Sequence, residues 1–336
     1  MEYRLVGRTG IRVSSIGLGC AGFGGIGSEA SLFGQGEDEK TAFSLMDHAF
    51  EVGINLFDTA NSYGGGRSEE MVGRWLSSRR GRNEVVLATK VATRLGTGVN
   101  DGGLSRRHIL QQVEESLRRL GTDWLDLYVT HQVDPETALD ETLRALDDLV
   151  RSGKVRYIGA SNIEGWRLVK GLWTSDRLGL ARFELAQNEY NLLQRTAEAQ
   201  VLPVTADQDL AFVAYSPLAG GWLTGKYRSR EPHPSNSRMK LRPGPYSHLG
   251  GEQTFAAIEA LAGEAAQRGV STGALALAWV TSHPRLTSAL VGPRSLDQFG
   301  VAVESLQLTL SAEERAAIAQ RMLGLGGQPG QLAAGR

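Results

Sequence analysis

The chain has 336 residues, with 36 basic and 37 acidic side chains and a formal net charge of −1. A chain so close to neutrality has no overall field that favours nucleic acid or an anionic membrane. It contains no apolar run of about 18 residues, as a membrane span would require, and no apolar core of signal-peptide length at its start. We therefore expect a cytoplasmic protein with no nucleic-acid or membrane partner. The single cysteine, Cys20, cannot form an internal disulfide, and the histidines lack metal-ligand spacing, so we expect no metal centre.

The first elements in chain order are a hairpin and a glycine-rich span. Residues 3–6 and 11–13 flank the turn Gly7–Gly10 and predict a short β-hairpin that caps part of the fold. The segment Gly17–Gly22 then fits the G-x-G-x-x-G pattern of a dinucleotide-binding loop. That pattern requires a helix that opens on its glycines, whereas helical periodicity begins only near Asp38. We interpret the span as a first strand followed by a loop that approaches a ligand.

From Asp38 onward, strand and helix patterns alternate. Asp38 is a suitable N-cap for a helix that runs to about Glu51, with a predicted buried face of Ala42, Leu45, Met46 and Ala49. Further helices are expected at 68–77, 105–120, 135–150, 164–173, 196–202, 252–268, 272–282, 295–305 and 312–322. Strands are expected to begin near residues 16, 54, 85, 124, 154, 183, 211 and 287.

The spacing of these strands predicts the fold class. Intervals of roughly 30 to 40 residues suit β–α units with parallel strands. Eight such units favour a closed α/β (β/α)8 TIM barrel over an open sheet, although the length alone would also allow two domains. We expect a single barrel domain over 1–322, a long loop at 216–250 after the seventh strand, and a flexible C-terminal tail over 323–336.

Ionisable residues stand at the ends of three successive strands. Asp58 ends the second, Lys90 the third and His131 the fourth, while Tyr63 lies on the loop after the second. Singly, they could be a loop cap, a surface lysine, a buried histidine and an ordinary loop aromatic. Because the carboxyl ends of barrel strands meet at one face, their joint occurrence predicts a shared site.

The four side chains suit proton transfer to an oxygen. A free tyrosine has a pKa of about 10, and we expect the Lys90 ammonium to lower the pKa of Tyr63. Asp58 would keep Lys90 charged and fixed, and His131 would orient a substrate oxygen. Such a set is a general acid for a developing alkoxide. No side chain supplies hydride, so a cofactor must.

The sequence resembles the aldo-keto reductases, NADPH-dependent (β/α)8 barrels, from about residue 3 to residue 310, and is close to their potassium-channel β-subunit-like branch. The similarity rests on motifs that follow one another in the family order. They are Gly53–Gly64, Leu87–Lys90, Thr130–Asp134, Gly159–Asn162, Gln187–Asn191, Tyr215–Gly221 and Val291–Gln298.

The resemblance implies roles for individual residues. Asp58, Tyr63, Lys90 and His131 would form a catalytic tetrad with Tyr63 as the acid, and the cofactor would be NADPH or NADP, with NAD less favoured. The carboxamide of the nicotinamide would be held by Ser161, Asn162 and Gln187, and Tyr215 would stack on its ring. The other cofactor-binding residues that it implies, for the pyrophosphate and the adenosine 2′-phosphate, are Ser216, Pro217, Leu218, Gly220, Lys226, Arg238, Gly292, Arg294 and Gln298.

Arg294 also has an independent argument. It follows the last strand and precedes a helix whose N-terminal amides favour an anion, although it could instead be a solvated surface arginine. The chain departs from the family nearby, because Gly300 and Ala302 occupy positions where many members carry a glutamate and an asparagine that meet the adenine. This departure bears on the preference for NADPH and not on the nicotinamide chemistry.

The leading hypothesis for function is therefore reduction of a small-molecule aldehyde or ketone to an alcohol. One alternative is an NADPH-binding regulatory subunit with little turnover, and another is an enoyl or keto reductase that acts on a nucleotide-linked deoxysugar. Relatives that reduce conjugated C=C bonds replace the histidine by glutamate, so His131 favours carbonyl reduction. Phe23, Trp222 and the 216–250 loop are candidates for the substrate pocket, and a homo-oligomer is possible.

Overall fold

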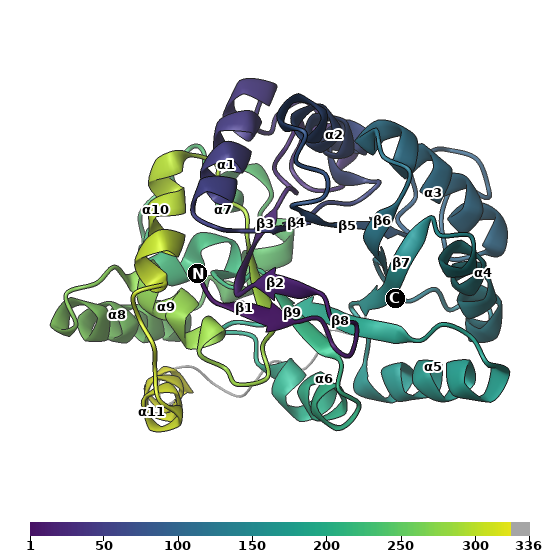
Figure 1. Cartoon of the computed structure of the whole chain (residues 1–336). Helices are drawn as coiled ribbons and strands as arrows, with labels where there is room; N and C mark the ends of the chain where they lie inside the picture. The colour runs from purple at the N-terminus through teal and green to yellow at the C-terminus, as the bar shows by residue number, and fades with distance from the viewer. Residues whose placement is uncertain (324–336) are drawn as a thin grey trace.

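A closed barrel of parallel strands forms the centre of the computed structural model, which describes residues 1–323 (Figure 1). The strands pair in the order β10-β3-β4-β5-β6-β7-β8-β9 and helices surround them, so the predicted TIM barrel is confirmed. Each strand begins within two residues of its predicted start. The barrel strands are β3 (Ile16–Gly19), β4 (Leu56–Asp58), β5 (Val86–Val91), β6 (Leu125–Thr130), β7 (Val155–Ser161), β8 (Phe183–Glu189), β9 (Ala211–Tyr215) and β10 (Ser288–Val291).

The helices follow the predicted alternation, and none of those in residues 1–323 is long and apolar enough to cross a membrane. The main helices are α1 (Glu39–Glu51), α2 (Arg67–Arg79), α3 (Arg106–Leu120), α4 (Leu139–Arg151), α5 (Gly165–Leu178), α6 (Thr196–Asp207), α8 (Glu252–Gln267), α9 (Thr272–Thr281), α10 (Leu296–Ser305) and α11 (Ala312–Leu323). The shorter ones are η1 (Ala30–Leu32), η2 (Tyr63–Gly66), η3 (Ala219–Thr224), α7 (Arg238–Leu241) and η4 (Gly244–Leu249). The 216–250 segment thus contains three short helical turns. Of the tail expected at 323–336, residues 324–336 lie outside the described part of the chain.

Side-chain hydrogen bonds explain where α1 and α4 begin. The Asp38 carboxylate accepts a hydrogen bond from the Thr41 backbone amide at 2.8 Å, so α1 starts where predicted, and the four residues of its predicted inner face are buried. The prediction for α4 was wrong by four residues, since the helix begins at Leu139 and not at Pro135. The Asp134 carboxylate there accepts hydrogen bonds from the Leu104 and Glu136 amides at 2.7 and 2.9 Å, which holds the intervening residues in a turn.

The N-terminal hairpin closes one end of the barrel. It consists of β1 (Tyr3–Leu5) paired with β2 (Arg12–Ser14), as predicted. Val6 and Val13 are buried in the cluster of side chains that fills the barrel interior. Arg4 donates to the backbone oxygen of Leu286, just before β10, so the hairpin lies at the amino-terminal ends of the strands. The opposite end, where the strands terminate, is left for a ligand.

Two helical glycines differ in how closely other elements approach them. A Cβ added to Gly73 in α2 would lie 2.8 Å from the Leu120 Cα of α3, a distance that real Cβ atoms do not reach. A Cβ added to the exposed Gly263 in α8 would meet no atom within 4 Å. Close packing of α2 on α3 therefore requires the glycine at 73.

We expect opposite effects on stability from Gly73→Ala and Gly263→Ala. Alanine gains about 1 kcal/mol of helix propensity over glycine, which should appear in full at position 263 as a higher thermal midpoint. At position 73 overpacking costs about 1–3 kcal/mol, so the net change should be destabilising. Thermal unfolding of the two variants beside the wild type measures the difference. A stabilised Gly73→Ala variant would contradict the tight α2–α3 contact.

Candidate active site

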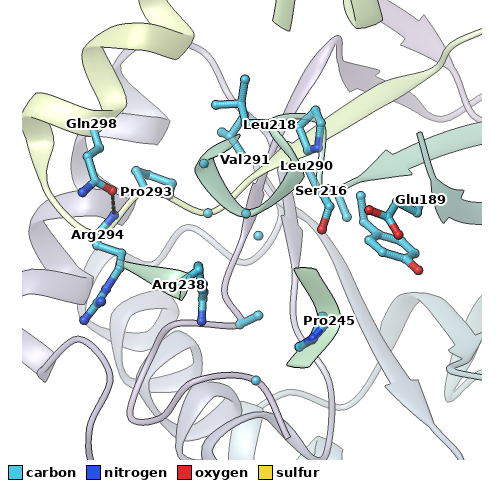
Figure 2. Close-up of a pocket in the computed structure, with 18 of the residues that line it drawn as sticks. Glu189, Ser216, Leu218, Arg238, Pro245, Leu290, Val291, Pro293, Arg294 and Gln298 are labelled. Carbon is cyan, nitrogen blue, oxygen red and sulfur yellow. Dashed lines mark hydrogen bonds between the residues drawn. The ribbon is translucent and has the colours of Figure 1, made fainter. Parts of the chain in front are cut away.

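A cavity of about 680 Å³ lies at the carboxyl-terminal ends of the barrel strands. Residues from the ends of β4, β7, β8, β9 and β10 line it, together with residues of the 216–250 segment (Figure 2). It has a charged end, around Arg238 and Arg294, and a second region near Ser216 and Glu189. Chemistry placed in this cavity can therefore draw on most strands of the barrel.

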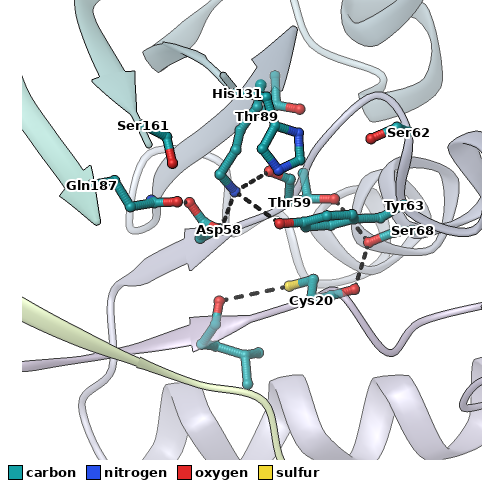
Figure 3. Close-up of polar contacts among 12 residues, drawn as sticks. Cys20, Asp58, Thr59, Ser62, Tyr63, Ser68, Thr89, His131, Ser161 and Gln187 are labelled. Carbon is teal, nitrogen blue, oxygen red and sulfur yellow. Dashed lines mark hydrogen bonds and ion pairs between the residues drawn. The ribbon is translucent and has the colours of Figure 1, made fainter. Parts of the chain in front are cut away.

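A buried ion pair joins the ends of two neighbouring strands. Asp58 pairs in register with Ala88 of β5, so Lys90, two residues further along β5, points to the same face. The Lys90 ammonium forms an ion pair with Asp58 Oδ1 and donates to the Thr59 backbone oxygen at 2.9 Å (Figure 3). Lys90 is only 1% exposed, so this lysine does not extend into solvent.

Tyr63 completes the group from the loop after β4. Its hydroxyl lies 3.4 Å from Lys90 Nζ, at hydrogen-bond distance, and points toward Asp58 (Figure 3). The other Asp58 oxygen, Oδ2, accepts from Gln187 Nε2 at 2.8 Å. Both oxygens of Asp58 are bound, one to Lys90 and one to Gln187. The carboxylate therefore holds the Lys90 ammonium next to the Tyr63 hydroxyl.

His131 approaches Tyr63 from β6. The two rings meet edge to face, with centroids 5.5 Å apart and an interplanar angle of 79°. The His131 backbone amide donates to the Val91 oxygen at 2.7 Å, and Thr93 Oγ1 lies 3.4 Å from the imidazole Nδ1. The imidazole is thereby held beside the phenol on the lining of the cavity.

Burial decides the protonation of these groups. Burial raises the pKa of Tyr63. Lys90 lowers it, as expected, but its effect is smaller than that of burial, so the net pKa is raised and not lowered. Burial opposes the charge of Lys90, but Asp58 and Tyr63 outweigh it and raise the pKa of the ammonium. Burial and the Lys90 charge together lower the pKa of His131 to about 3. At neutral pH the site therefore holds a protonated phenol, a charged lysine and a neutral imidazole.

We expect His131 to weaken the folded state in acid. With a folded pKa of about 3 and an unfolded pKa of about 6.5, the unfolded chain binds the extra proton, so stability rises with pH across this window. The slope should be at most about 1.4 kcal/mol per pH unit, and the contribution is complete above pH ~6.5.

Denaturant unfolding of the wild type and of His131→Gln at several pH values isolates this contribution. His283, whose pKa is lowered to about 4 mainly by burial, is common to both proteins and cancels in the difference. Proton NMR of His131 should show no titration above pH 5 in the folded protein. A His131 midpoint near 6.5 would contradict the assignment of a neutral, desolvated ring.

Residues at the ends of β7 and β9 form a second layer around the tetrad. Asn162, which has the positive φ of 54°, donates through Nδ2 to the His131 backbone oxygen at 2.8 Å. Its Oδ1 accepts from the Tyr215 hydroxyl at 2.6 Å. Asn162 thus ties His131 to Tyr215, and its amide is already bound to protein groups.

The other end of the cavity is cationic. Arg294 forms an ion pair with Glu37 and donates to the Asn236 oxygen at 2.8 Å, which brings the loop after β3 and the 216–250 segment to the end of β10. Burial lowers the pKa of Lys226, as do the charges of Arg238 and Arg294, and burial lowers the pKa of Arg238. Cations held close together in this way favour an anionic ligand, and the donor set suits the phosphates of a dinucleotide cofactor.

Nearly all of the predicted site residues meet at this cavity. Lys90 lies behind Asp58 and Tyr63 and does not line it. The predicted residues that line it are Asp58, Tyr63, His131, Ser161, Asn162, Gln187, Tyr215, Ser216, Pro217, Leu218, Gly220, Lys226, Arg238, Gly292, Arg294 and Gln298.

The two aromatic candidates for the substrate pocket lie elsewhere. Phe23 and Trp222 are 1% and 0% exposed and belong to the core that packs outside the barrel. The Trp222 ring stacks obliquely on Tyr227 and Phe255, at 5.0 and 5.3 Å between centroids. Both residues stand among glycines in the sequence, a pattern typical of loops. Their rings are nevertheless buried in the hydrophobic core.

The lining residues that were not singled out include Glu189, Arg242 and Tyr246, the last two within the 216–250 loop that was named only as a whole. Glu189 follows Gln187 by two positions, so strand alternation would have placed it on the same face. Burial raises the pKa of its carboxyl. Tyr246 lies across Gly220, and its hydroxyl is 3.0 Å from Ser216 Oγ. Arg242 and Tyr246 come from the irregular 216–250 segment, where no periodicity indicates direction.

The family comparison agrees with the fold. Residues 15–321 match the Aldo/keto reductase family, and the chain belongs to it. Among its relatives, the uncharacterized oxidoreductase YrpG of Bacillus subtilis (strain 168) is 39% identical and covers 93% of each chain. The versiconal hemiacetal acetate reductase of Aspergillus parasiticus is 34% identical, over 94% of this chain and 95% of that protein. A probable voltage-gated potassium channel subunit beta of Oryza sativa subsp. japonica is also 34% identical and covers 92% of each chain.

Proposed function

We propose that this protein reduces an aldehyde or ketone to an alcohol with NADPH, and that Tyr63 gives the proton. The observation that carries the proposal is the contact of the Tyr63 hydroxyl with the ammonium of the buried Asp58–Lys90 pair. Membership of an oxidoreductase family supports it, as does the reductase name of the Aspergillus relative. The substrate is a small carbonyl compound that fits beside Tyr63 and His131 in the cavity.

The residues of the tetrad have separate roles in protonating the substrate oxygen. When bound, the cofactor supplies hydride to the carbonyl carbon. Tyr63 and the neutral His131 hydrogen-bond the carbonyl oxygen, which orients it and stabilises the charge that develops there. As the C=O π pair becomes an alkoxide lone pair, the Tyr63 proton moves to that oxygen. The Lys90 ammonium, held by Asp58, stabilises the phenolate until a solvent proton restores the phenol.

The cationic end of the cavity supports a preference for NADPH over NADH. Arg294, Lys226 and Arg238 would bind the phosphates, and Ser161 and Gln187 would meet the carboxamide. Asn162 could join them only by exchanging one of its contacts to His131 and Tyr215. Ala302 lines the cavity and Gly300 adds no side chain, so the adenine would be bound mainly by packing.

The variant Tyr63→Phe should retain NADPH binding and lose turnover. Removal of a general acid costs about 10²–10⁴-fold in kcat, and the phenyl ring preserves the packing. Stopped-flow or steady-state NADPH oxidation with a good aldehyde substrate measures the loss. Tyr157→Phe, which removes a hydroxyl that donates to Thr9 at the hairpin end of the barrel, is the matched control and should keep wild-type turnover. Wild-type kcat in a folded, NADPH-binding Tyr63→Phe variant would contradict the mechanism.

The variant Arg294→Gln should weaken NADPH binding and leave NADH binding nearly unchanged. Loss of charge-assisted hydrogen bonds to a phosphate corresponds to about 10–100-fold in Kd. Because the change also leaves Glu37 unpaired, Glu37→Gln/Arg294→Gln separates binding from folding, and exposed Arg228→Gln is the surface control. Fluorescence titration gives both Kd values. An equal loss for NADH and NADPH would show that Arg294 does not meet the 2′-phosphate.

A regulatory subunit with little turnover is the second candidate, favoured by the similarity to the Oryza channel subunit. Tight NADPH binding together with negligible turnover on aldehydes and ketones would support it against the reductase. Transfer of deuteride from labelled NADPH, with NMR of the product, distinguishes reduction at C=O from reduction at a conjugated C=C bond.

A further inference from the structure

Arg242 lines the cavity without a partner from the protein. It follows α7 in the 216–250 segment and is half-buried. Within residues 1–323 its guanidinium has neither a hydrogen-bond acceptor nor an ion-pair partner, whereas that of Arg294 is bound to Glu37 and to the Asn236 oxygen. A guanidinium keeps its charge at physiological pH, and a charge taken partly out of water favours a partner of the opposite sign. The cavity therefore offers a free cation to an anionic ligand.

The Arg242 side chain lies against the wall of the cavity that carries Tyr63. A Cβ added to Gly27, which also lines the cavity, would lie 2.8 Å from Arg242 Nη1. The Gly27 oxygen accepts a hydrogen bond at 2.9 Å from the amide of Gly64, the residue that follows Tyr63. The guanidinium is therefore placed beside a segment that is bonded directly to the loop of the proposed proton donor.

Two further tyrosines connect Arg242 with Tyr63 along the lining of the cavity. Burial raises the pKa of Tyr246, and the charge of Arg242 is among the influences that oppose it. Burial also raises the pKa of Tyr215, and both Tyr246 and Tyr63 add to this increase. Charges shift a pKa mainly at short range, so Arg242, Tyr246, Tyr215 and Tyr63 follow one another as neighbours.

The carboxyl groups on the lining do not neutralise Arg242. They belong to Asp58, Glu189 and Asp297. Asp58 is paired with Lys90, and burial raises the pKa of Glu189, which favours its uncharged form. Asp297 lies in the first turn of α10, at the end of the cavity that holds the other cations. The positive charge of Arg242 is thus left for a ligand.

Arg242 is also separate from the residues proposed to bind the cofactor phosphates. Burial lowers the pKa of Arg238, and the charges of Arg294 and Arg242 add to this effect, so Arg238 is near both. Figure 2 shows Pro245, three residues after Arg242, below Ser216 and well apart from Arg294. Arg242 therefore belongs to the part of the cavity between the phosphate-binding cations and the tetrad.

We propose that Arg242 binds a carboxylate of the substrate, so that the protein reduces aldehydes that carry an acid group at the end opposite the carbonyl. The inference rests on the proposed reductase function. With the carbonyl at Tyr63 and His131, the rest of the substrate would run past Tyr246 to the guanidinium. A guanidinium matches a carboxylate through two parallel N–H···O bonds. One arginine balances the single charge of a carboxylate, whereas a phosphate monoester carries nearly two.

Steady-state NADPH oxidation with matched substrates tests the contact. The substrates are ω-oxo carboxylates of increasing chain length, each beside its uncharged methyl ester. We expect the acid of best-fitting length to exceed its ester in kcat/KM by about 10–100-fold, as charge-assisted hydrogen bonds provide. Arg242→Gln should abolish this advantage through a higher KM for the acid and leave the ester unaffected, and Arg242→Lys, which keeps the charge, should retain part of it. Arg228→Gln, exposed in the same segment, is the control and should keep the full preference.

Calorimetric titration of the NADP complex with the corresponding ω-hydroxy carboxylates measures the same contact without turnover. Arg242→Gln should raise their Kd by about 10–100-fold and leave the Kd of NADPH unchanged. Weaker NADPH binding in this variant would assign Arg242 to the cofactor and overturn the inference. A preference for an aldehyde phosphate over every carboxylate would also overturn it.

The two measurements separate this inference from the reductase function on which it rests. Turnover of the esters with no preference for any of the acids would overturn the carboxylate site and support the reductase. Absence of turnover on all of the aldehydes, together with binding of an ω-hydroxy carboxylate that depends on Arg242, would contradict the reductase and support the carboxylate site.

Discussion

The buried ion pair between Asp58 and Lys90 is the interaction on which the site depends. Two charges taken out of water are stable only when their remaining hydrogen bonds are satisfied, and here Gln187 and the Thr59 carbonyl oxygen satisfy them. Loss of one partner would leave the other charge buried and unpaired, which would lower the free energy of unfolding by about 3–5 kcal/mol. The pair also fixes the register of β4 against β5, because both residues must reach the same point above the barrel.

Polarity changes along the cavity in a way that matches a dinucleotide cofactor. At the tetrad the Tyr63 phenol is protonated and the His131 imidazole is neutral, so two uncharged rings line this end of the cavity. At the far end the cations around Arg294 gather where β10 ends and the 216–250 segment folds back. The proposed proton donor and the cationic region therefore occupy separate parts of one barrel face, each formed by different strands.

The β7–α5 unit shows how one repeat of the barrel meets two different surroundings. The end of β7 supplies Ser161 and Asn162 to the cavity, where Asn162 ties His131 to Tyr215. Three residues later α5 begins, and its outer face carries Trp166 and Trp173. The residues at the end of β7 line the cavity, while the two tryptophans of α5 are exposed and take no part in the core.

The sequence by itself determined the barrel, the hairpin and the ends of the strands, because these follow from local periodicity and caps such as Asp38. It also brought Asp58, Lys90 and His131 together, since the closure of parallel strands places their carboxyl ends at one face. Only the tertiary structure decided that burial outweighs Lys90 in setting the pKa of Tyr63. It likewise decided that Trp222 is buried and that Tyr246 reaches the cavity, because desolvation and the path of an irregular segment depend on residues distant in the chain.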